Sequence, residues 1–237
     1  MMTRVSYNQR PLQGVFVTGT DTGIGKTRVC VGLIEALKCK GLSVCGMKPV
    51  ASGCFRENDA LRNEDAILLR AHASVSIDYA RVNPYAFEPP VSPHIAARQS
   101  GNVISAAGIV DAFDYLCDHA DFVVVEGVGG WEVPLNDTER VSDLARNLGL
   151  PVVMVVGLRL GCLNHAVLTS IAIRNSGCQL IGWVANGIDP GFRCVEANLA
   201  TLRGMIPAPQ IGWIPYCRDA ESETLVRCFN LDDWLVT

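Results

Sequence analysis

One segment, Gly19–Thr27, constrains the fold more than any other part of the chain. It reads Gly-Thr-Asp-Thr-Gly-Ile-Gly-Lys-Thr and lies between a predicted strand over Gly14–Thr18 and a predicted helix over Gly25–Lys38. Its glycines let backbone N–H groups turn toward a phosphate, and the helix N-terminus adds a favourable dipole. Lys26 can reach the terminal phosphates, and the hydroxyl of Thr27 can bind Mg²⁺. The segment therefore predicts a nucleoside triphosphate site on a strand–loop–helix unit.

The spacing of the glycines departs from the common phosphate loop. The usual pattern places a glycine where this chain has Thr20, and Gly19 stands one residue too early. Strand, turn, Gly-Lys-Thr and helix nevertheless follow in the order that the motif demands, so we predict a variant phosphate loop.

The rest of the chain alternates short β-branched runs with longer segments of helical period, which is typical of βαβ units and a parallel sheet. We predict further strands over residues 43–50, 121–125, 151–156, 180–185 and 210–214. We predict further helices beginning near Asn58 or Asp59 and over residues 105–118, 142–147, 163–175 and 192–203. The expected fold is α/β and of the P-loop NTPase type, with a mostly parallel central sheet and helices on both faces. All 237 residues are expected to form a single domain, with a core over about 14–216 and an N-terminal extension over 1–12.

The composition excludes several classes of protein. Hydrophobic residues make up 49% of the chain and charged residues only 19%, below the roughly 25% of an average soluble domain. With a net charge of −4 and no run of Lys or Arg, the chain lacks the basic stripe of a nucleic-acid binder. No uncharged stretch approaches the roughly 20 residues that span a bilayer, and no apolar leader is present. We expect a cytoplasmic protein with neither nucleic acid nor membrane as partner.

The 10 cysteines form no C-x-x-C pair, and most lie in apolar runs such as Val29-Cys30-Val31. We interpret them as small buried thiols in a reducing compartment, in preference to a thiolate metal site.

A proline-rich stretch over residues 82–93 holds four of the 12 prolines. Proline is excluded from helix interiors and central strands, so we predict an extended surface loop. It could be a rigid connector or the wall of a ligand pocket.

Two carboxylates are candidates for a magnesium site, because Mg²⁺ prefers hard oxygen ligands beside phosphate. Glu126 ends the apolar run over residues 122–125, at the edge where open α/β sheets bind ligands. Asp65 is by its pattern alone more typical of an exposed helix residue.

Several segments together resemble the dethiobiotin synthetase family, the ATP-dependent carboxylases of biotin synthesis. They are the phosphate loop, Lys-Pro-Val-Ala-Ser-Gly at 48–53, Leu-Arg-Asn-Glu-Asp at 61–65, Asn-Pro-Tyr at 83–85, Ser-Pro-His at 92–94, Val-Glu-Gly-Val-Gly-Gly-Trp at 125–131 and Gly-Trp-Val-Ala-Asn at 182–186. The resemblance runs from about residue 14 to 216, and 48–53 is its most specific part.

The resemblance implies a reaction in which CO2 joins 7,8-diaminononanoate (diaminopelargonate), MgATP phosphorylates the carbamate, and the cyclic urea of dethiobiotin closes with release of ADP and phosphate. ATP would be a co-substrate and Mg²⁺ the cofactor. A carbamate anion must meet an anionic γ-phosphate, so the site needs several positive charges. Lys26, Lys48 and Mg²⁺ would supply them.

The resemblance also assigns roles residue by residue. Lys26 and Lys48 would be catalytic, and the metal would be held by Thr27, Asp65 and Glu126. The ATP-binding positions would be Gly23, Ile24, Gly25, Lys26, Thr27, Arg28, Asp65, Glu126, Gly127, Val128, Gly129, Asn186, Gly187, Ile214, Pro215 and Tyr216. Asn186 would contact adenine, with the last three lining the base. The substrate would be bound by Thr22, Lys48, Ser52, Gly161, Cys162, Leu163 and Asn164.

Gly161–Asn164 matches a helix N-terminus that in this family binds the substrate carboxylate across a dimer interface, which implies a homodimer. Trp131 and Leu163 look like exposed apolar positions that would suit such an interface. On the sequence pattern alone, the segment fits a glycine turn into a core helix equally well.

Two other classes of protein use related scaffolds. A dimeric ATPase switch usually carries a second lysine early in the loop, where this chain has Asp21. A glutamine-dependent amide ligase is expected to carry an additional glutaminase domain, for which no length is left after Tyr216. The sequence favours the carboxylase, but leaves open its nucleotide selectivity beyond a purine triphosphate and the identity of any general base.

Overall fold

A six-stranded parallel sheet forms the centre of the molecule, in a computed structural model that describes residues 12–217, 222–232 and 234. The strand order is β10-β9-β8-β1-β7-β2, and every neighbouring pair is parallel. The strands are β1 (Gly14–Gly19), β2 (Val44–Met47), β7 (Phe122–Glu126), β8 (Val152–Leu158), β9 (Leu180–Gly187) and β10 (Gln210–Ile214). The predicted fold class is confirmed.

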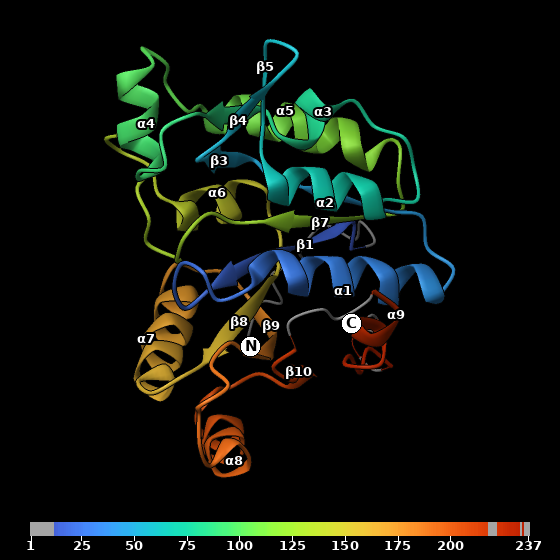
Figure 1. Cartoon of the computed structure of the whole chain (residues 1–237), viewed down its shortest axis with the longest axis vertical. Helices are drawn as coiled ribbons and strands as arrows, with labels where there is room; N and C mark the ends of the chain where they lie inside the picture. The colour runs from blue at the N-terminus through green and yellow to red at the C-terminus, as the bar shows by residue number, and fades with distance from the viewer. Residues whose placement is uncertain (1–11, 218–221, 233, 235–237) are drawn as a thin grey trace, which may run out of the picture.

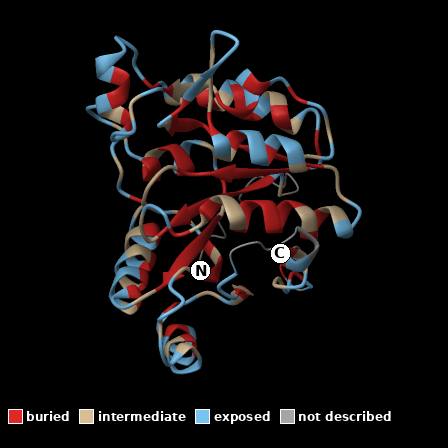
Figure 2. Ribbon diagram, viewed as in Figure 1, coloured by how far each residue is buried: buried red, intermediate tan, exposed pale blue. Residues whose placement is uncertain are grey.

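Helices cover both faces of this sheet (Figure 1). They are α1 (Lys26–Cys39), α2 (Glu64–His72), α3 (Tyr79–Val82), α4 (Pro93–Gln99), α5 (Ala106–Cys117), α6 (Val141–Asn147), α7 (Cys162–Asn175), α8 (Val195–Met205) and α9 (Ser222–Val226). Successive strand residues point to opposite faces, so β1 sends Val15 and Val17 into the core beneath α1 and Phe16 into the core beneath α5 to α8. Figure 2 shows the strands and the inner helix surfaces as buried.

The predicted strand over 43–50 is shorter in the structure, where only 44–47 belong to the central sheet. The predicted helix start at Asn58 or Asp59 is wrong. The central strand β2 ends at Met47, and β3 (Val50–Ser52) pairs with β6 (Tyr85–Phe87) in a separate sheet. β4 (Phe55–Glu57) and β5 (Ala60–Arg62) form an antiparallel hairpin. Asn58 and Asp59 form its turn with φ of 49° and 64°, values that Asn and Asp tolerate in tight hairpin turns. The helix begins later, at Glu64.

The proline-rich stretch is only partly the surface loop that we predicted. Its Tyr85–Phe87 segment lies between prolines and pairs with β3, and Phe87 is buried. The buried Asn83 donates from Nδ2 to the backbone oxygen of Lys48 at 2.7 Å. This stretch therefore supports the backbone of Lys48.

The interpretation of the cysteines is right for some and wrong for others. All 10 are free thiols; Cys30, Cys45, Cys54 and Cys162 are buried, whereas Cys39, Cys194 and Cys217 are exposed. Within the described residues, no cluster of three or more His, Cys, Asp or Glu is placed to hold a metal ion. No helix in the same part of the chain is long and apolar enough to cross a membrane.

The segment after β10 packs against α1. Leu225, Leu231 and Trp234 are buried in the α1 core. A side chain at Gly32 of α1 would meet the ring of Phe229 at 2.4 Å, so only glycine allows this close approach. The predicted extension over 1–12 falls, except for its last residue, outside the described residues.

Candidate active site

The phosphate loop connects β1 to α1, as the sequence predicted. Gly23 and Gly25 have left-handed φ of 71° and 82°, which glycine adopts without the strain that most side chains would cause. A Cβ at Gly25 would also meet Nδ2 of Asn186 at 2.2 Å. Asn186, at the end of β9, donates from the same nitrogen to the carbonyl of Ile24 at 2.8 Å. Asn186, the residue predicted to contact adenine, therefore lies directly against the phosphate loop.

A cavity of about 400 Å³ opens beside this loop, beyond the carboxyl ends of β1, β2 and β7. Parallel strands end at a common edge, which brings together residues that are far apart in the sequence. Predicted residues that line the cavity are Thr22, Gly23, Gly25, Lys26, Thr27, Lys48, Ser52, Asp65, Glu126, Val128 and Gly129. Ala51 and Asn63 also line it and were not predicted.

Lys48 lies between the two predicted metal-binding carboxylates. Its ammonium donates to Asp65 Oδ2 at 2.8 Å and to Glu126 Oε1 at 2.5 Å. The hydroxyl of Thr27 donates to the same Glu126 oxygen at 3.0 Å, whereas Oε2 of Glu126 is buried and has no hydrogen-bond partner among the residues that the structure describes. Lys48 and Glu126 are 4% and 1% exposed and are therefore shielded from water, whereas the side chain of Asp65 is 37% exposed.

The electrostatics of the two lysines differ. Burial by itself lowers the pKa of Lys48, but the charges of Glu126 and Asp65 outweigh burial and hold that pKa above its usual range. Burial lowers the pKa of Lys26 to about 8, and repulsion by Lys48 adds to the effect. Lys48 is thus a permanent cation at neutral pH, and Lys26 is a cation that loses its proton in mildly alkaline solution.

Lys26 is held by the loop itself. Its ammonium donates to the backbone oxygen of Asp21 at 3.0 Å. The carboxylate of Asp21 accepts from the backbone N–H of Thr22 at 2.7 Å and pairs with the guanidinium of Arg159. Arg159 directly follows β8, and the sequence analysis missed it; a basic residue after a central strand is the only signal that points to it.

Asn63 orients Asp65. It is the N-cap of α2, and its Oδ1 accepts from the backbone N–H of Ala66 at 3.2 Å. The phenol of Tyr79 accepts from the backbone N–H of Asn63 at 2.7 Å. An asparagine before an apolar helical run is a helix-start signal, so the sequence contained the information needed to find this residue.

The predicted base-binding residues lie together, outside the lining of the cavity. A Cβ at Gly187 would meet the backbone nitrogen of Tyr216 at 2.5 Å, so the end of β9 touches the segment after β10. Arg28 donates to the carbonyl of Cys217 at 3.2 Å, which ties α1 to that segment.

Gly161–Asn164 forms the N-terminus of α7 and does not line the cavity of its own chain. Gly161 is a left-handed N-cap with φ of 95°, and no side chain of a described residue caps the helix. Among the described residues, the backbone N–H groups of Leu163 and Asn164 have no acceptor. Such unpaired N–H groups can bind an anion.

Trp131 and Leu163, which we predicted to be exposed apolar positions, are not exposed in the structure. Trp131 is 3% exposed and packs edge-to-face on Phe16 with ring centroids 6.2 Å apart, and Leu163 is half-buried. The exposed apolar side chains of this region are Leu160, Leu168 and Ile171, at and along α7.

Comparisons with known proteins show what this chain is similar to. A family model described as an AAA domain matches residues 13–224. The chain is 53% identical over 206 residues to an ATP-dependent dethiobiotin synthetase of Pseudomonas paraeruginosa, covering 86% of this chain and 90% of the relative. It is 50% identical over 200 residues to a protein of the same name from Cellvibrio japonicus, covering 84% and 88%.

Solved structures share the fold at much lower sequence identity. A MinD cell division protein of Aquifex aeolicus is 16% identical with a TM-score of 0.55, covering 92% of this chain and 88% of that one. A ParA family ATPase of Chlorobium tepidum is 15% identical with a TM-score of 0.53, covering 91% and 90%. At such identities the likeness establishes the fold alone.

Proposed function

The chain belongs to the family of ATP-dependent dethiobiotin synthetases, and we propose that it makes dethiobiotin from 7,8-diaminononanoate, CO2 and ATP through a carbamate and a carbamic–phosphoric anhydride. It is an ATP-dependent ligase. The main support for the detailed proposal is the position of Lys48. This residue is a buried cation, and it lines the same cavity as the phosphate loop.

The reaction has three steps. One amine of the diamine attacks CO2, forming an N–C bond and releasing a proton. A carbamate oxygen then attacks the γ-phosphorus of ATP, and the bond to ADP breaks. The second amine then attacks the carbonyl carbon of the anhydride, the bond from that carbon to the phosphate oxygen breaks, and the attacking nitrogen loses a proton. This closes the cyclic urea and releases phosphate.

The two lysines suit different parts of this sequence. Lys26 lies in the loop that would surround the β- and γ-phosphates, and Lys48 would hold the carbamate and the transferring phosphoryl group. Charges that are fixed in a buried site stabilise developing negative charge without having to reorient. Thr22 and Ser52, which line the cavity beside them, would hydrogen-bond the substrate.

The residues present fit a magnesium ion. Thr27, Asp65 and Glu126 offer hard oxygen ligands, and the buried Oε2 of Glu126 has no hydrogen-bond partner in the described part of the chain. A bound Mg²⁺ would supply positive charge to the phosphate oxygens of ATP. Asp65 and Glu126 would exchange at least part of their contact with Lys48 for the metal, which would leave the ammonium available to the substrate.

We also propose that the active form is a cytoplasmic homodimer in which the N-terminus of α7 reaches the partner's cavity. Support comes from the unpaired N–H groups of Leu163 and Asn164, which suit the substrate carboxylate and lie outside the cavity of their own chain. Leu160, just before α7, is 94% exposed, and Leu168, on α7, is 59% exposed; large exposed apolar side chains of this kind favour a protein interface.

ADP release is expected to require both the diamine and bicarbonate, because the phosphoryl acceptor is the carbamate and not water. The test compares three reactions: diamine with bicarbonate, glutamine with a carboxylic acid, and ATP alone. Mass spectrometry of the first reaction should detect dethiobiotin. Equal ADP release without the diamine would refute the proposed chemistry and favour an ATPase switch.

Nucleotide binding is expected to weaken above pH 8. The pKa of Lys26 is about 8, and a bound phosphate group favours the protonated form of this lysine. Above this pH the free protein has lost the proton from Lys26, so ATP binding must be accompanied by proton uptake. The dissociation constant of ATP should therefore be flat below that pH and rise by up to about tenfold per pH unit above it. Calorimetry in buffers of different ionisation enthalpy measures both the affinity and the proton uptake. Lys26→Arg stays protonated and should give a flat profile even where it binds more weakly; a profile unchanged by this substitution would rule out Lys26 as the titrating group.

A further inference from the structure

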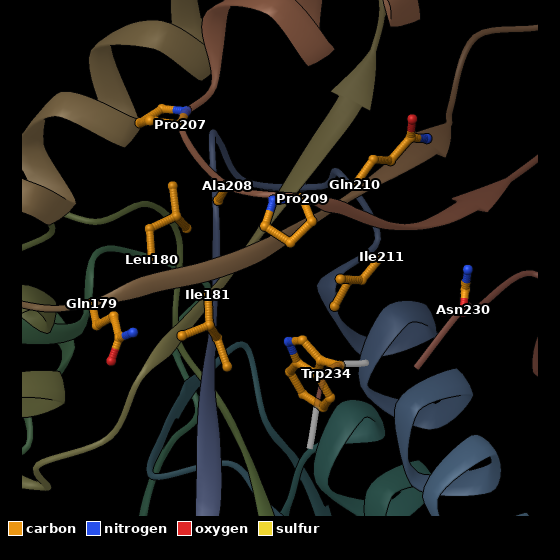
Figure 3. A pocket seen from close by; sticks show the side chains of 10 residues that line it. All are labelled: Gln179, Leu180, Ile181, Pro207, Ala208, Pro209, Gln210, Ile211, Asn230 and Trp234. Carbon is orange, nitrogen blue, oxygen red and sulfur yellow. The ribbon is translucent and has the colours of Figure 1, made fainter. Parts of the chain in front are cut away.

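A second cavity, of about 350 Å³, lies at the opposite edge of the sheet from the phosphate loop. It is formed where β9 and β10 begin, by Leu180, Ile181 and Ile211, and by Pro209 from the loop before β10 (Figure 3). The C-terminal segment closes one side with Trp234. A volume of this size is typical of small-molecule sites.

Trp234 presents an unused hydrogen-bond donor to this cavity. The residue is 7% exposed, and its indole Nε1 is buried without a partner among the described residues. Figure 3 shows the nitrogen on the side of the ring that faces Ile181 and the middle of the cavity. A buried N–H without a partner is unfavourable, so the site favours a ligand with a hydrogen-bond acceptor.

A positive charge lies at the far end of the same groove. An adjoining cavity of about 390 Å³ shares Gln179, Leu180 and Pro207 with the first one, and Arg174 lines it. Arg174 forms no ion pair within the part of the chain that the structure describes. Among the described residues, none of those that line the first cavity is charged.

We propose that this groove binds an amphipathic carboxylic acid that carries a neutral acceptor, such as an amide or urea carbonyl, at its other end. The acceptor would accept from Nε1 of Trp234, the aliphatic chain would lie on Leu180, Ile181 and Pro209, and the carboxylate would pair with Arg174. The uncharged lining discriminates against ligands that are charged at both ends, because burying a charge without a partner is unfavourable.

The probes are adipamic, suberamic and sebacamic acids, which carry an amide at one end, a carboxylate at the other and chains of three lengths. The chain has four tryptophans, so the indole N–H region of a ¹H–¹⁵N spectrum contains few signals, and Trp234→Phe identifies the one from Trp234. Titration with at least one probe should shift this signal saturably and leave those of Trp131 and Trp183 in place. No saturable shift with any of the three acids would overturn the proposal, as would equal shifts of all four indoles.

Two further ligands and two variants distinguish the contributions that the two ends of the groove make to binding. Octanoate lacks the acceptor and octanamide lacks the carboxylate. Arg174→Gln should weaken binding of the best amide acid about tenfold and leave octanamide unaffected, because only the acid uses the guanidinium. Trp234→Phe, followed by calorimetry, should abolish a preference of about fivefold for the amide acid over octanoate. If both variants weakened all ligands equally, they would have disturbed the fold and the assignment of the two ends would be wrong.

Discussion

Lys48→Ala is expected to lower kcat by at least ~100-fold while the affinity for MgATP changes little, since loss of one preorganised charge-stabilising group has an effect of this size. The ammonium of Lys48 stands 2.8 Å from Asp65 and 2.5 Å from Glu126, and Lys48 is not part of the loop whose backbone would bind the phosphates. Pre-steady-state phosphoryl transfer, measured beside nucleotide affinity by calorimetry, separates chemistry from binding. Retention of more than about a tenth of wild-type turnover would exclude the assigned role.

Lys48→Met is the matched variant, because methionine fills much of the same space without the charge. Removing the cation leaves Glu126 buried beside Asp65, and breaking a buried ion pair costs about 3–5 kcal/mol. The free variant should therefore melt at a lower temperature, and Mg²⁺ should restore more stability to it than to the wild type.

Thr27→Val keeps Lys48 and should instead raise the Mg²⁺ concentration required for turnover.

The parts of the site that the sequence predicted well are those set by strand ends. Glu126 and Asn186 each end an apolar run, and parallel strands bring such ends to one edge, so their meeting at the phosphate loop follows from the fold class. The phosphate loop was also predictable, because its conformation requires glycine at particular positions. Gly25, for example, has no space for a side chain beside Asn186.

The parts that the sequence could not predict depend on tertiary contacts. The Asn58-Asp59 turn looked like a helix start, and this error moved the beginning of α2 away from Asn63 and hid the reason why Asp65 faces Lys48. The exposure of Trp131 was misjudged because its burial depends on Phe16, which is more than a hundred residues away along the chain. The pairing of Arg159 with Asp21 likewise joins two loops that no local pattern connects.

Complementation between two inactive chains provides the test of the shared site. Asn164→Asp is suited to it, because Asn164 is exposed in the first turn of α7, whereas Cys162 is buried and a charge there would disturb the core. An acidic residue in the first turn favours the helix and repels the substrate carboxylate. Alone, Asn164→Asp and Lys48→Ala should each be nearly inactive. The control Asn175→Asp, at the far end of α7, should remain active.

In a mixed dimer of Lys48→Ala and Asn164→Asp, one site collects both lesions and the other collects neither, provided that α7 serves the partner's cavity. After random exchange of equal amounts, half of the dimers are mixed and each has one intact site of two, so activity should recover to about a quarter of wild type. If α7 served its own chain, every site would carry one lesion and no activity would return. Sedimentation must first demonstrate subunit exchange; absence of recovery after that, or a fully active monomer, would contradict a site built from two chains.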